Sequence, residues 1–546
     1  MRALCFFLVV INVSLMCTAS SKAQDKPQLE TALRSDSRQK AAAPLPPPQG
    51  LQDHVASGKL VLALDDSIRL ALSNNTDIRL DHSQIDFALD NLGRAHAPFD
   101  PLATFSFADS RAKVPATNQN QGATITNNLS QTTAFGYSQT FQTGTNFQTT
   151  FAGSKSSTNS SRAFINPSLL TNLQFTITQP LLRNFGLFPN RAPILIAQRN
   201  LKQARSNFTA QVNNIILGII GDYWSVVLAR ENLSVQQKSL DEAQKSYDHD
   251  KKALSLGALP PLDIYRSESQ VASRRVGLIQ AEYSLKQTAD QFRRDIGADL
   301  DPSIRVLDLE LTDQPAPLGE LPATDIAVAL SRALVNRPEF ETVRQQLASD
   351  ELNVRLAHNN LKPDLELSGF YEGNAAAGDQ LNPNPPPPVF RAGLGDSLSQ
   401  TFHFTYPAYG GTLSLNLPVR RHGAQANLAD ALVSRRQDQF LERRTTQSIT
   451  LEVTNAVHSL EEAKLTMEAA KIAVDLARES LHADERKYEL GAEPVFFVLD
   501  AQTQLAQAEL NLIQAQINFQ IAVAQVDHAT GDLLEHHRVQ ITEPAK

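Results

Sequence analysis

Long stretches of this chain repeat apolar residues at helical spacing. Across residues 449–481 and 505–526 the apolar positions alternate spacings of four and three, and across residues 271–292 they recur every seven. A repeat of 3.5 residues is typical of long α-helices that supercoil against neighbouring helices, because it keeps one apolar seam facing the partner. The pattern therefore predicts two pairs of long helices, at about residues 190–297 and about residues 424–530.

Between these helices the period changes from helical to two. FSF at residues 105–107 and LSL at residues 413–415 alternate apolar with polar residues, and loops rich in Asn, Thr and Ser separate such runs. Alternation at period two is typical of β-strands that have two different faces. We expect strands at about residues 98–182 and about residues 363–419, at least two in each region, with an extra hairpin around Gly144 in the longer first region.

The same short turn occurs twice. LGALPPLDIY at residues 256–265 and LGAEPVFFVL at residues 490–499 begin 234 residues apart, and each stands between two predicted long helices. A glycine suits the C-cap of the preceding helix and a proline suits the turn that follows, so each stretch is predicted to join its helices into an antiparallel hairpin. These turn residues are Gly257, Pro260, Gly491 and Pro494.

The rest of the chain repeats along with these turns. We assign a first copy to residues 59–300 and a second copy to residues 324–533, joined by a linker at residues 301–323. A spacing of 234 residues is far longer than the stacking repeat of a solenoid, so the pattern indicates one duplicated unit. In each copy the strands give way to helices at a proline followed by a glycine. These junction residues are Pro180, Gly186, Pro418 and Gly423.

The ends of the chain differ from both copies. Residues 1–23 have an early arginine, an apolar core and then small residues, which predicts a secretory signal peptide; an uncleaved membrane anchor is the alternative. Cys17 is weighed as a lipidation site, but the large Met16 before it fits such processing poorly. Residues 24–58 are expected to form a Pro-rich flexible lead-in, and residues 534–546 a C-terminal tail.

Composition and chemistry argue against several functions. The formal net charge is −8 and no basic cluster stands out, so nucleic acid is not an expected partner. The histidines lack metal-ligand spacing and no Gly-rich phosphate loop occurs. We therefore expect no enzyme activity, no metal and no cofactor.

The strand regions have no apolar core of their own to pack against. Strands of this kind suit a transmembrane β-barrel, with the apolar face toward lipid and the polar face toward the lumen. Four strands from one chain cannot close a barrel, and an open sheet edge is not tolerated in lipid. The expected fold class is therefore mixed α and transmembrane β. A trimer would share a 12-stranded β-barrel and continue it as an α-helical tunnel made of the long coiled-coil hairpins.

Paired motifs recur in the same order in both copies. LSNN at residues 72–75 pairs with LVNRPE at 334–339, and QPLL at 179–182 pairs with LPVR at 417–420, each followed by its LGA turn. This order resembles the outer-membrane efflux protein family, the TolC-like outer-membrane factors, over nearly all of residues 60–532.

The resemblance implies a function and a set of partners. It implies a passive exit duct of a tripartite efflux or type I secretion system, placed in the bacterial outer membrane with its helical domain in the periplasm. The implied partners are two further copies in a homotrimer, a periplasmic adaptor protein, and an inner-membrane pump of the RND, ABC or MFS type. Lipid of the outer membrane would surround the barrel.

The resemblance also implies that the tunnel closes near the hairpin tips. Asp263 matches a tip aspartate of the family, and Tyr488 matches a tyrosine of its constriction network. Asp500 matches a second acidic residue of the family. Phe497, however, stands where the family has an acid, and Glu493 stands where it has a cationic gate residue, so the gate network of this chain departs from the family pattern.

Physical reasoning offers two interpretations of these tip residues. Copies of Asp500 around a narrow pore would form an acidic ring that favours cations, and Phe497 or Phe496 would form an apolar constriction. In the alternative interpretation, Asp263 and Asp500 are acids stabilised at helix N-termini by the helix dipole, and the aromatic residues pack within the turn.

Two other classes of protein fit part of the pattern. A periplasmic coiled-coil structural or scaffold protein would use the β segments as a small head domain. An adaptor protein would have one helical hairpin flanked by compact β domains, not two duplicated halves. The alternating strands and the duplication favour the duct.

Overall fold

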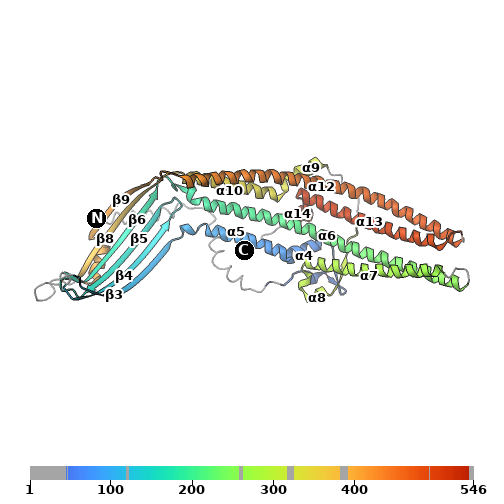
Figure 1. Ribbon diagram of the computed structural model, residues 1–546, viewed down its shortest axis with the longest axis horizontal. Helices are drawn as coiled ribbons and strands as arrows, with labels where there is room; N and C mark the ends of the chain where they lie inside the picture. Colours follow the sequence, from blue (N-terminus) through green and yellow to red (C-terminus); the bar gives the residue numbers. More distant parts are fainter. Residues whose placement is uncertain are drawn as a thin grey trace. The chain divides into compact units, whose positions relative to one another are not determined.

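The computed structural model of the protein describes residue 45 and residues 47–117, 122–256, 262–316, 325–380, 392–490 and 492–539 (Figure 1). The expected signal peptide and most of the expected lead-in lie outside these described residues. The same holds for three of the turn residues, Gly257, Pro260 and Gly491.

The chain divides into two compact units. The helical unit comprises Met1–Asp81, Gln211–Asn336 and Thr450–Lys546, and the sheet unit comprises His82–Ala210 and Arg337–Ile449. The two longest helices run through both.

Four long helices carry the predicted seven-residue pattern. They are α6 (Leu187–Ser255), α7 (Asp263–Asp295), α12 (His422–Glu489) and α13 (Val495–Thr530). Val453 and Leu460 on the α12 seam are at most 5% exposed, and Phe292 on α7 is fully buried. Phe292 meets Tyr223 of α6 edge to face, with 5.9 Å between ring centroids. The predicted helix pairs are therefore confirmed, and at 1.5 Å per residue α6 is about 100 Å long.

One stretch of α6 is apolar for a reason other than membrane insertion. Among the described helices, only a window within Leu187–Lys252 has the length and composition to cross a membrane, and 56% of that window is buried inside the structure. Ile216, Ile220 and Trp224 are almost completely covered there. The stretch is thus the core of the helical unit.

Shorter helices precede each long pair and show the duplication in three dimensions. Helices α4 (Leu64–Asn74) and α5 (Thr76–Arg94) open the first copy, and α9 (Ile326–Asn336) and α10 (Pro338–Asn360) open the second. Each long pair then ends at a glycine in the left-handed region that lies against an asparagine of the opening helix. These pairs are Gly297 with Asn74 and Gly531 with Asn336.

We expect Gly297→Ala to destabilise the helical unit by more than its backbone strain alone. Gly297 has φ 72°, and a Cβ there would lie 2.7 Å from Cβ of Asn74. The left-handed conformation costs an alanine about 1–2 kcal/mol, and the clash adds to that penalty. Gly58→Ala is the matched control, because Gly58 has φ 77° with open space around it. Thermal unfolding that moves equally in both variants would contradict the expectation.

A small three-stranded sheet combines the end of the predicted lead-in, the start of the predicted first copy and part of the predicted linker. Its strands are β1 (Val55–Ala56), β2 (Lys59–Leu62) and β7 (Asp308–Leu311), in the order β1-β2-β7. Strand β7 pairs in parallel with β2, so the expected linker is partly a structural strand. Short helices accompany this sheet and the other junctions: η1 (Leu51–His54), η2 (Ala97–Phe99), η4 (Ala298–Leu300), α8 (Pro302–Arg305) and α14 (Leu533–His536).

The sheet unit contains six long antiparallel strands in the order β3-β4-β5-β6-β8-β9 (Figure 1). The expectation of four strands per chain, on which a 12-stranded trimer rests, is therefore wrong. The first region forms four strands and the second forms two. The strands are β3 (Leu102–Pro115), β4 (Ile125–Thr140), β5 (Asn146–Thr158), β6 (Ile165–Pro180), β8 (Asp364–Gln380) and β9 (Tyr406–Asn416).

The turn and junction residues selected from the sequence lie at or near the ends of strands and helices. The hairpin expected around Gly144 is confirmed: Phe141 donates its backbone N–H to Thr145 at 2.8 Å, and Gly144 has φ 85°. Pro180 ends β6, and Gly186, at φ 87°, directly precedes α6. Pro418 follows β9, whereas Gly423 is the second residue of α12 and lies within that helix.

The six-stranded sheet has one apolar face and one polar face. Register places Phe105, Phe135, Phe151 and Leu173 opposite one another in a row across four strands. The neighbouring row, on the other face, is mostly small or polar: Thr104, Gly136, Thr150, Gln174 and Glu372. Because side chains alternate between faces, this separation follows from the period-two pattern of the sequence.

Candidate functional site

The two hairpin tips of the helical unit bring together several residues selected from the sequence. Helix α6 ends at Ser255 and α7 begins at Asp263, whose side chain lies outside the described residues. Helix α12 ends at Glu489, and Pro494 is the N-cap of α13.

A fully buried aspartate, which the sequence analysis did not select, lies at the centre of this cluster. Asp250 of α6 has no solvent exposure. Ser267 of α7 donates its hydroxyl to one carboxylate oxygen of Asp250. Tyr488 of α12 donates its hydroxyl to the other, at 3.3 Å. His249 Nδ1 lies 3.6 Å from that second oxygen and its ring meets Tyr488 edge to face.

This arrangement joins three helices through one carboxylate. Burial raises the pKa of Tyr488 above its usual value of 10.0, and the nearby Asp250 raises it further, so the phenol stays a hydrogen-bond donor. A buried carboxylate needs such donors, because an unpartnered charge is costly away from water. Tyr488, which the family resemblance placed in a constriction network, thus has a hydrogen-bond partner, Asp250, in the same chain.

Glu493 belongs to a second, more exposed cluster. Its carboxylate accepts a hydrogen bond from Lys487 Nζ at 3.0 Å, and Lys487 also donates to Asp484 at 3.0 Å. These two carboxylates raise the pKa of Lys487. The acid at position 493 is therefore paired with a cation in the last turn of α12.

Asp500 and the two aromatic residues of α13 are not drawn into these clusters. Asp500 is exposed and accepts a hydrogen bond from Gln504 at 2.6 Å. Phe496 and Phe497 are 54% and 46% exposed and contact each other edge to face. Large exposed phenyl rings do not stabilise a turn by burial. The structure therefore leaves all three residues available to another surface.

A second group of contacts between the two hairpins lies on α7 and α13. Arg274 of α7 donates to the hydroxyl of Thr503 on α13 at 2.6 Å, and Gln270 reaches the same oxygen at 3.4 Å. Each polar contact of this kind contributes about 0.5–1.5 kcal/mol, so breaking these contacts has a moderate cost.

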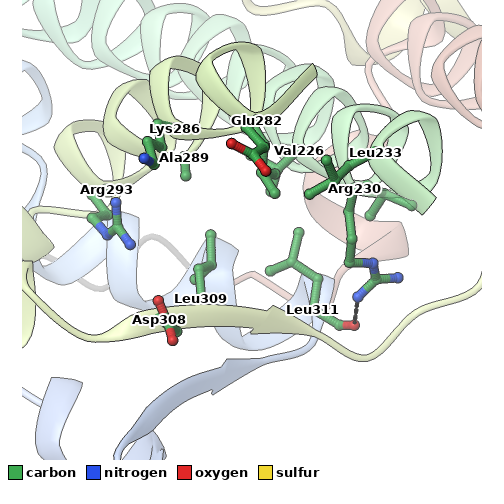
Figure 2. A pocket seen from close by; sticks show the side chains of 12 residues that line it. Val226, Arg230, Leu233, Glu282, Lys286, Ala289, Arg293, Asp308, Leu309 and Leu311 are labelled. Atoms are coloured by element: carbon green, nitrogen blue, oxygen red, sulfur yellow. Dashed lines mark hydrogen bonds between the residues drawn. The ribbon is translucent and has the colours of Figure 1, made fainter. Parts of the chain in front are cut away.

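A pocket of about 320 Å³ lies between α6, α7 and β7 (Figure 2). Two arginines reach from the helices to β7 and to the residue before it: Arg230 donates to the carbonyl oxygen of Leu311, and Arg293 to that of Leu307, both at 2.8 Å. Strand β7 is an edge strand, so these arginines satisfy backbone groups that no further strand covers. The pocket also contains Glu282 and Asp308, and this mixture of charges is that of a structural junction.

Asp222 of α6 and Asp295 at the end of α7 form a pair of facing carboxyl groups. Burial raises the pKa of Asp222 from 3.8 to about 7, with hydrogen bonding and repulsion from Asp295 adding to the effect. The folded protein thus holds a proton that the unfolded chain releases at lower pH. This stabilisation is present below about pH 4 and is lost as the pH rises through about 7.

We expect Asp222→Asn to reduce the loss of stability of the helical unit between pH 5 and pH 8, because the amide cannot titrate. Thermal unfolding at both pH values measures this. Asp241→Asn, an exposed change on the same helix, is the control and should keep the original pH dependence. An equal pH dependence in all three proteins would contradict the assignment.

Within the described ranges, no group of three or more His, Cys, Asp and Glu side chains is arranged to hold a metal ion. The tip residues offer hydrogen bonds and charge, which are the means by which a narrow passage is closed or made selective.

Comparison with known proteins identifies the kind of molecule to which this geometry belongs. The model of the outer membrane efflux protein family matches residues 146–298 and 329–532. Strands β3 and β4 precede the first matched segment.

Individual relatives agree with the family match. Outer membrane protein TolC of Vibrio cholerae is 23% identical over 362 residues, which cover 64% of this chain and 75% of that protein. TolC of Escherichia coli is 25% identical over 335 residues, which cover 59% of this chain and 62% of that protein. Among solved structures, the CusC channel superposes with a TM-score of 0.62 at 16% identity, covering 90% of this chain and 97% of that one.

Proposed function

Because the chain belongs to the outer membrane efflux protein family, we propose that three copies of it assemble into a single exit duct across the bacterial outer membrane. The family consists of outer-membrane channels, and the chain is an exit duct of efflux systems. The observation that supports a barrel shared among copies is the six-stranded sheet, which has one apolar face and, among the described residues, two unpaired edges. The number three is what family membership favours. An open sheet with such a face is stable in lipid only when its edges are paired.

The two edge strands of the sheet, β3 and β9, can pair with each other between neighbouring copies. The strands alternate in direction across the sheet, so β3 and β9 run in opposite directions. Placing β9 of one copy beside β3 of the next continues the antiparallel order without interruption. Such a head-to-tail contact closes into a ring when the rotation permits it. Three copies then contribute eighteen strands to the barrel.

The apolar face has dimensions suited to a membrane. On β8 it extends from Leu365 to Ala375, ten residue steps, or about 33 Å along the strand. Strands of membrane barrels tilt by about 35–45°, which reduces this length to about 25 Å of height. The polar face, which carries Gln174 and Glu372, then lines the lumen.

In the proposed duct the tips of the hairpins form the periplasmic constriction. Asp250 and Tyr488 hold α12 against α6 and α7 in the closed arrangement, and release of this contact would widen the passage. A periplasmic adaptor and an inner-membrane pump of the RND, ABC or MFS type are the partners that family membership favours. They would supply both the trigger and the energy.

We expect Asp500→Ala to weaken cation selectivity of the duct in planar bilayers. Asp500 is exposed near the α12–α13 turn, and three symmetric copies would place three negative charges around the passage. Glu509→Ala on the same helix is the control, because Glu509 lies near Arg478 of α12. Unchanged reversal potentials in Asp500→Ala would remove this residue from the conducting pathway.

The mass of the detergent-extracted particle, corrected for bound detergent, tests the proposal as a whole. We expect three chains per particle and extraction that depends on detergent. A soluble monomer or dimer would contradict the duct and would favour a periplasmic coiled-coil scaffold.

A further inference from the structure

A short helix, α11 (Leu394–Phe402), lies on the apolar face of the six-stranded sheet, over β6 and β8. Thr171, which the register places on that face, contacts Ser397 Oγ at 2.7 Å and Thr401 Oγ1 at 2.6 Å through its hydroxyl. The ring of Phe402 stacks on Phe151, with 6.1 Å between centroids and 7° between planes. The helix therefore covers part of the surface that the proposed duct turns toward lipid.

The sheet is shaped to receive this helix. At Gly373 a Cβ would lie 2.7 Å from the carbonyl oxygen of Thr401 and 2.6 Å from the ring of Phe404. Ala375 and Ala377, on the same face of β8, are only 6% and 5% exposed. In the same row as Gly373, strands β3, β4, β5 and β6 carry the large apolar side chains of Phe105, Phe135, Phe151 and Leu173. The small residues of β8 thus accommodate the helix backbone.

The polarity of α11 is unusual for a helix on a water-exposed surface. Its contact with the sheet uses Ser397 and Thr401, which are completely buried. Leu394 and Phe402, in contrast, are 55% and 59% exposed. On a water-exposed surface a helix is expected to bury its apolar residues against the protein, whereas α11 leaves Leu394 and Phe402 more than half exposed. Leu394, Leu398 and Phe402 follow at intervals of four and form one stripe along the helix.

The position of α11 along the strands places it at one end of the apolar face. Toward Pro115 at the end of β3 and Thr158 at the end of β5, the apolar face gives way to charged residues, including Asp109 and Lys155. Thr171 pairs with Gly153, one same-face step from Lys155. The helix therefore lies at the border of the apolar surface, and its polar residues Asp396, Ser399 and His403 are exposed.

We propose that α11 is an interfacial membrane helix whose Leu394, Leu398 and Phe402 insert among the acyl chains of the outer leaflet beside the barrel. The proposal rests on the proposed function, because it requires the apolar face of the sheet to meet lipid. Helices of this kind place their apolar stripe about 5–10 Å into the boundary between headgroups and acyl chains. The helix carries no lysine or arginine, so acyl chains and not anionic headgroups are its partner.

Site-specific fluorescence quenching tests this placement. Single cysteines at Phe402, Phe107 and Ser106 would each carry an environment-sensitive nitrobenzoxadiazole probe in the full chain, reconstituted into phosphatidylcholine vesicles. Phe107 reports the apolar face of the sheet, and Ser106 reports the polar face. The unsubstituted chain, whose cysteines are at positions 5 and 17, gives the background labelling. Quenchers are a shallow nitroxide lipid, a deep nitroxide lipid and aqueous iodide.

We expect the shallow lipid quencher to be the most effective at position 402, both lipid quenchers to act at 107, and iodide to act at 106. A probe at 402 that responds to iodide alone, while 107 responds to lipid, would overturn the role of α11 and leave the duct intact. Protection of position 402 from all quenchers would also overturn it, since another protein chain would then cover the helix. Loss of lipid quenching at 107 would instead contradict the proposed function. Leu394→Cys repeats the test if Phe402→Cys fails to assemble.

Discussion

Phe135→Arg is expected to remove most of the protein from the outer membrane, while Thr132→Arg on the same strand is expected to leave it there. Phe135 lies on the apolar face between Phe105 and Phe151, and it is 48% exposed in the single chain. An arginine facing lipid near the middle of a barrel wall costs about 2–4 kcal/mol, or roughly a 30- to 1,000-fold shift for each chain. A trimer would carry that penalty three times.

The control depends on the alternation of side chains. Thr132 lies three residues earlier on β4, is exposed and points to the polar face, where an arginine would meet water in the lumen. Membrane fractionation followed by heat-modifiable gel mobility would measure assembly of both variants. Equal insertion of the two would mean that the apolar face does not meet lipid. Equal loss of both would indicate a folding defect unrelated to the membrane.

Asp250→Ala is expected to shift the tip toward its open state by about 10- to 150-fold. The variant removes the acceptor of two hydroxyl groups, from Ser267 and Tyr488, that join three helices. A hydrogen bond to a charged group contributes about 1.5–3 kcal/mol, and loss of only one already gives a shift of this size. Because Tyr488 of α12 reaches a fully buried carboxylate of α6, loss of this contact should appear as increased conductance in planar bilayers.

Two further variants separate opening from general instability. Tyr488→Phe removes one hydroxyl and keeps the ring, so it should open the tip less than Asp250→Ala. Asp248→Ala changes an exposed acid on the same helix turn and should leave the conductance unchanged. Conductance of Asp250→Ala at the level of the unsubstituted protein would show that this cluster does not hold the tip closed.

The long helices could be predicted well because their signal is local and repeated. Each seam residue supports the same assignment over many turns, as the burial of Val453 and Leu460 shows. Strands β3 and β4 were harder to count. Residues 125–140 are mostly Asn, Ser, Thr and Gln, and a strand with a lumen-facing polar side has the composition of a loop.

The small sheet and the buried acid were missed for different reasons. Strands β2 and β7 have four residues each and pair across about 250 positions of sequence, so no local pattern predicts them. Asp250, in contrast, could have been found from the spacing of residues along the helix. It stands seven residues after Ala243, another buried seam position, and an acid on an apolar seam indicates a specific partner.

The extra strands also bear on how such ducts diversify. From Asn74 to Gly297 the first copy is 28 residues longer than the equivalent span from Asn336 to Gly531, close to the combined length of β3 and β4. A hairpin adds two strands, which preserves the alternation at the seam between copies. A threefold ring can therefore widen only in steps of six strands. Adding a hairpin to each copy does not change the number of long helices. Evolution can therefore enlarge the outer mouth of the duct independently of the end at which the helical hairpins close it.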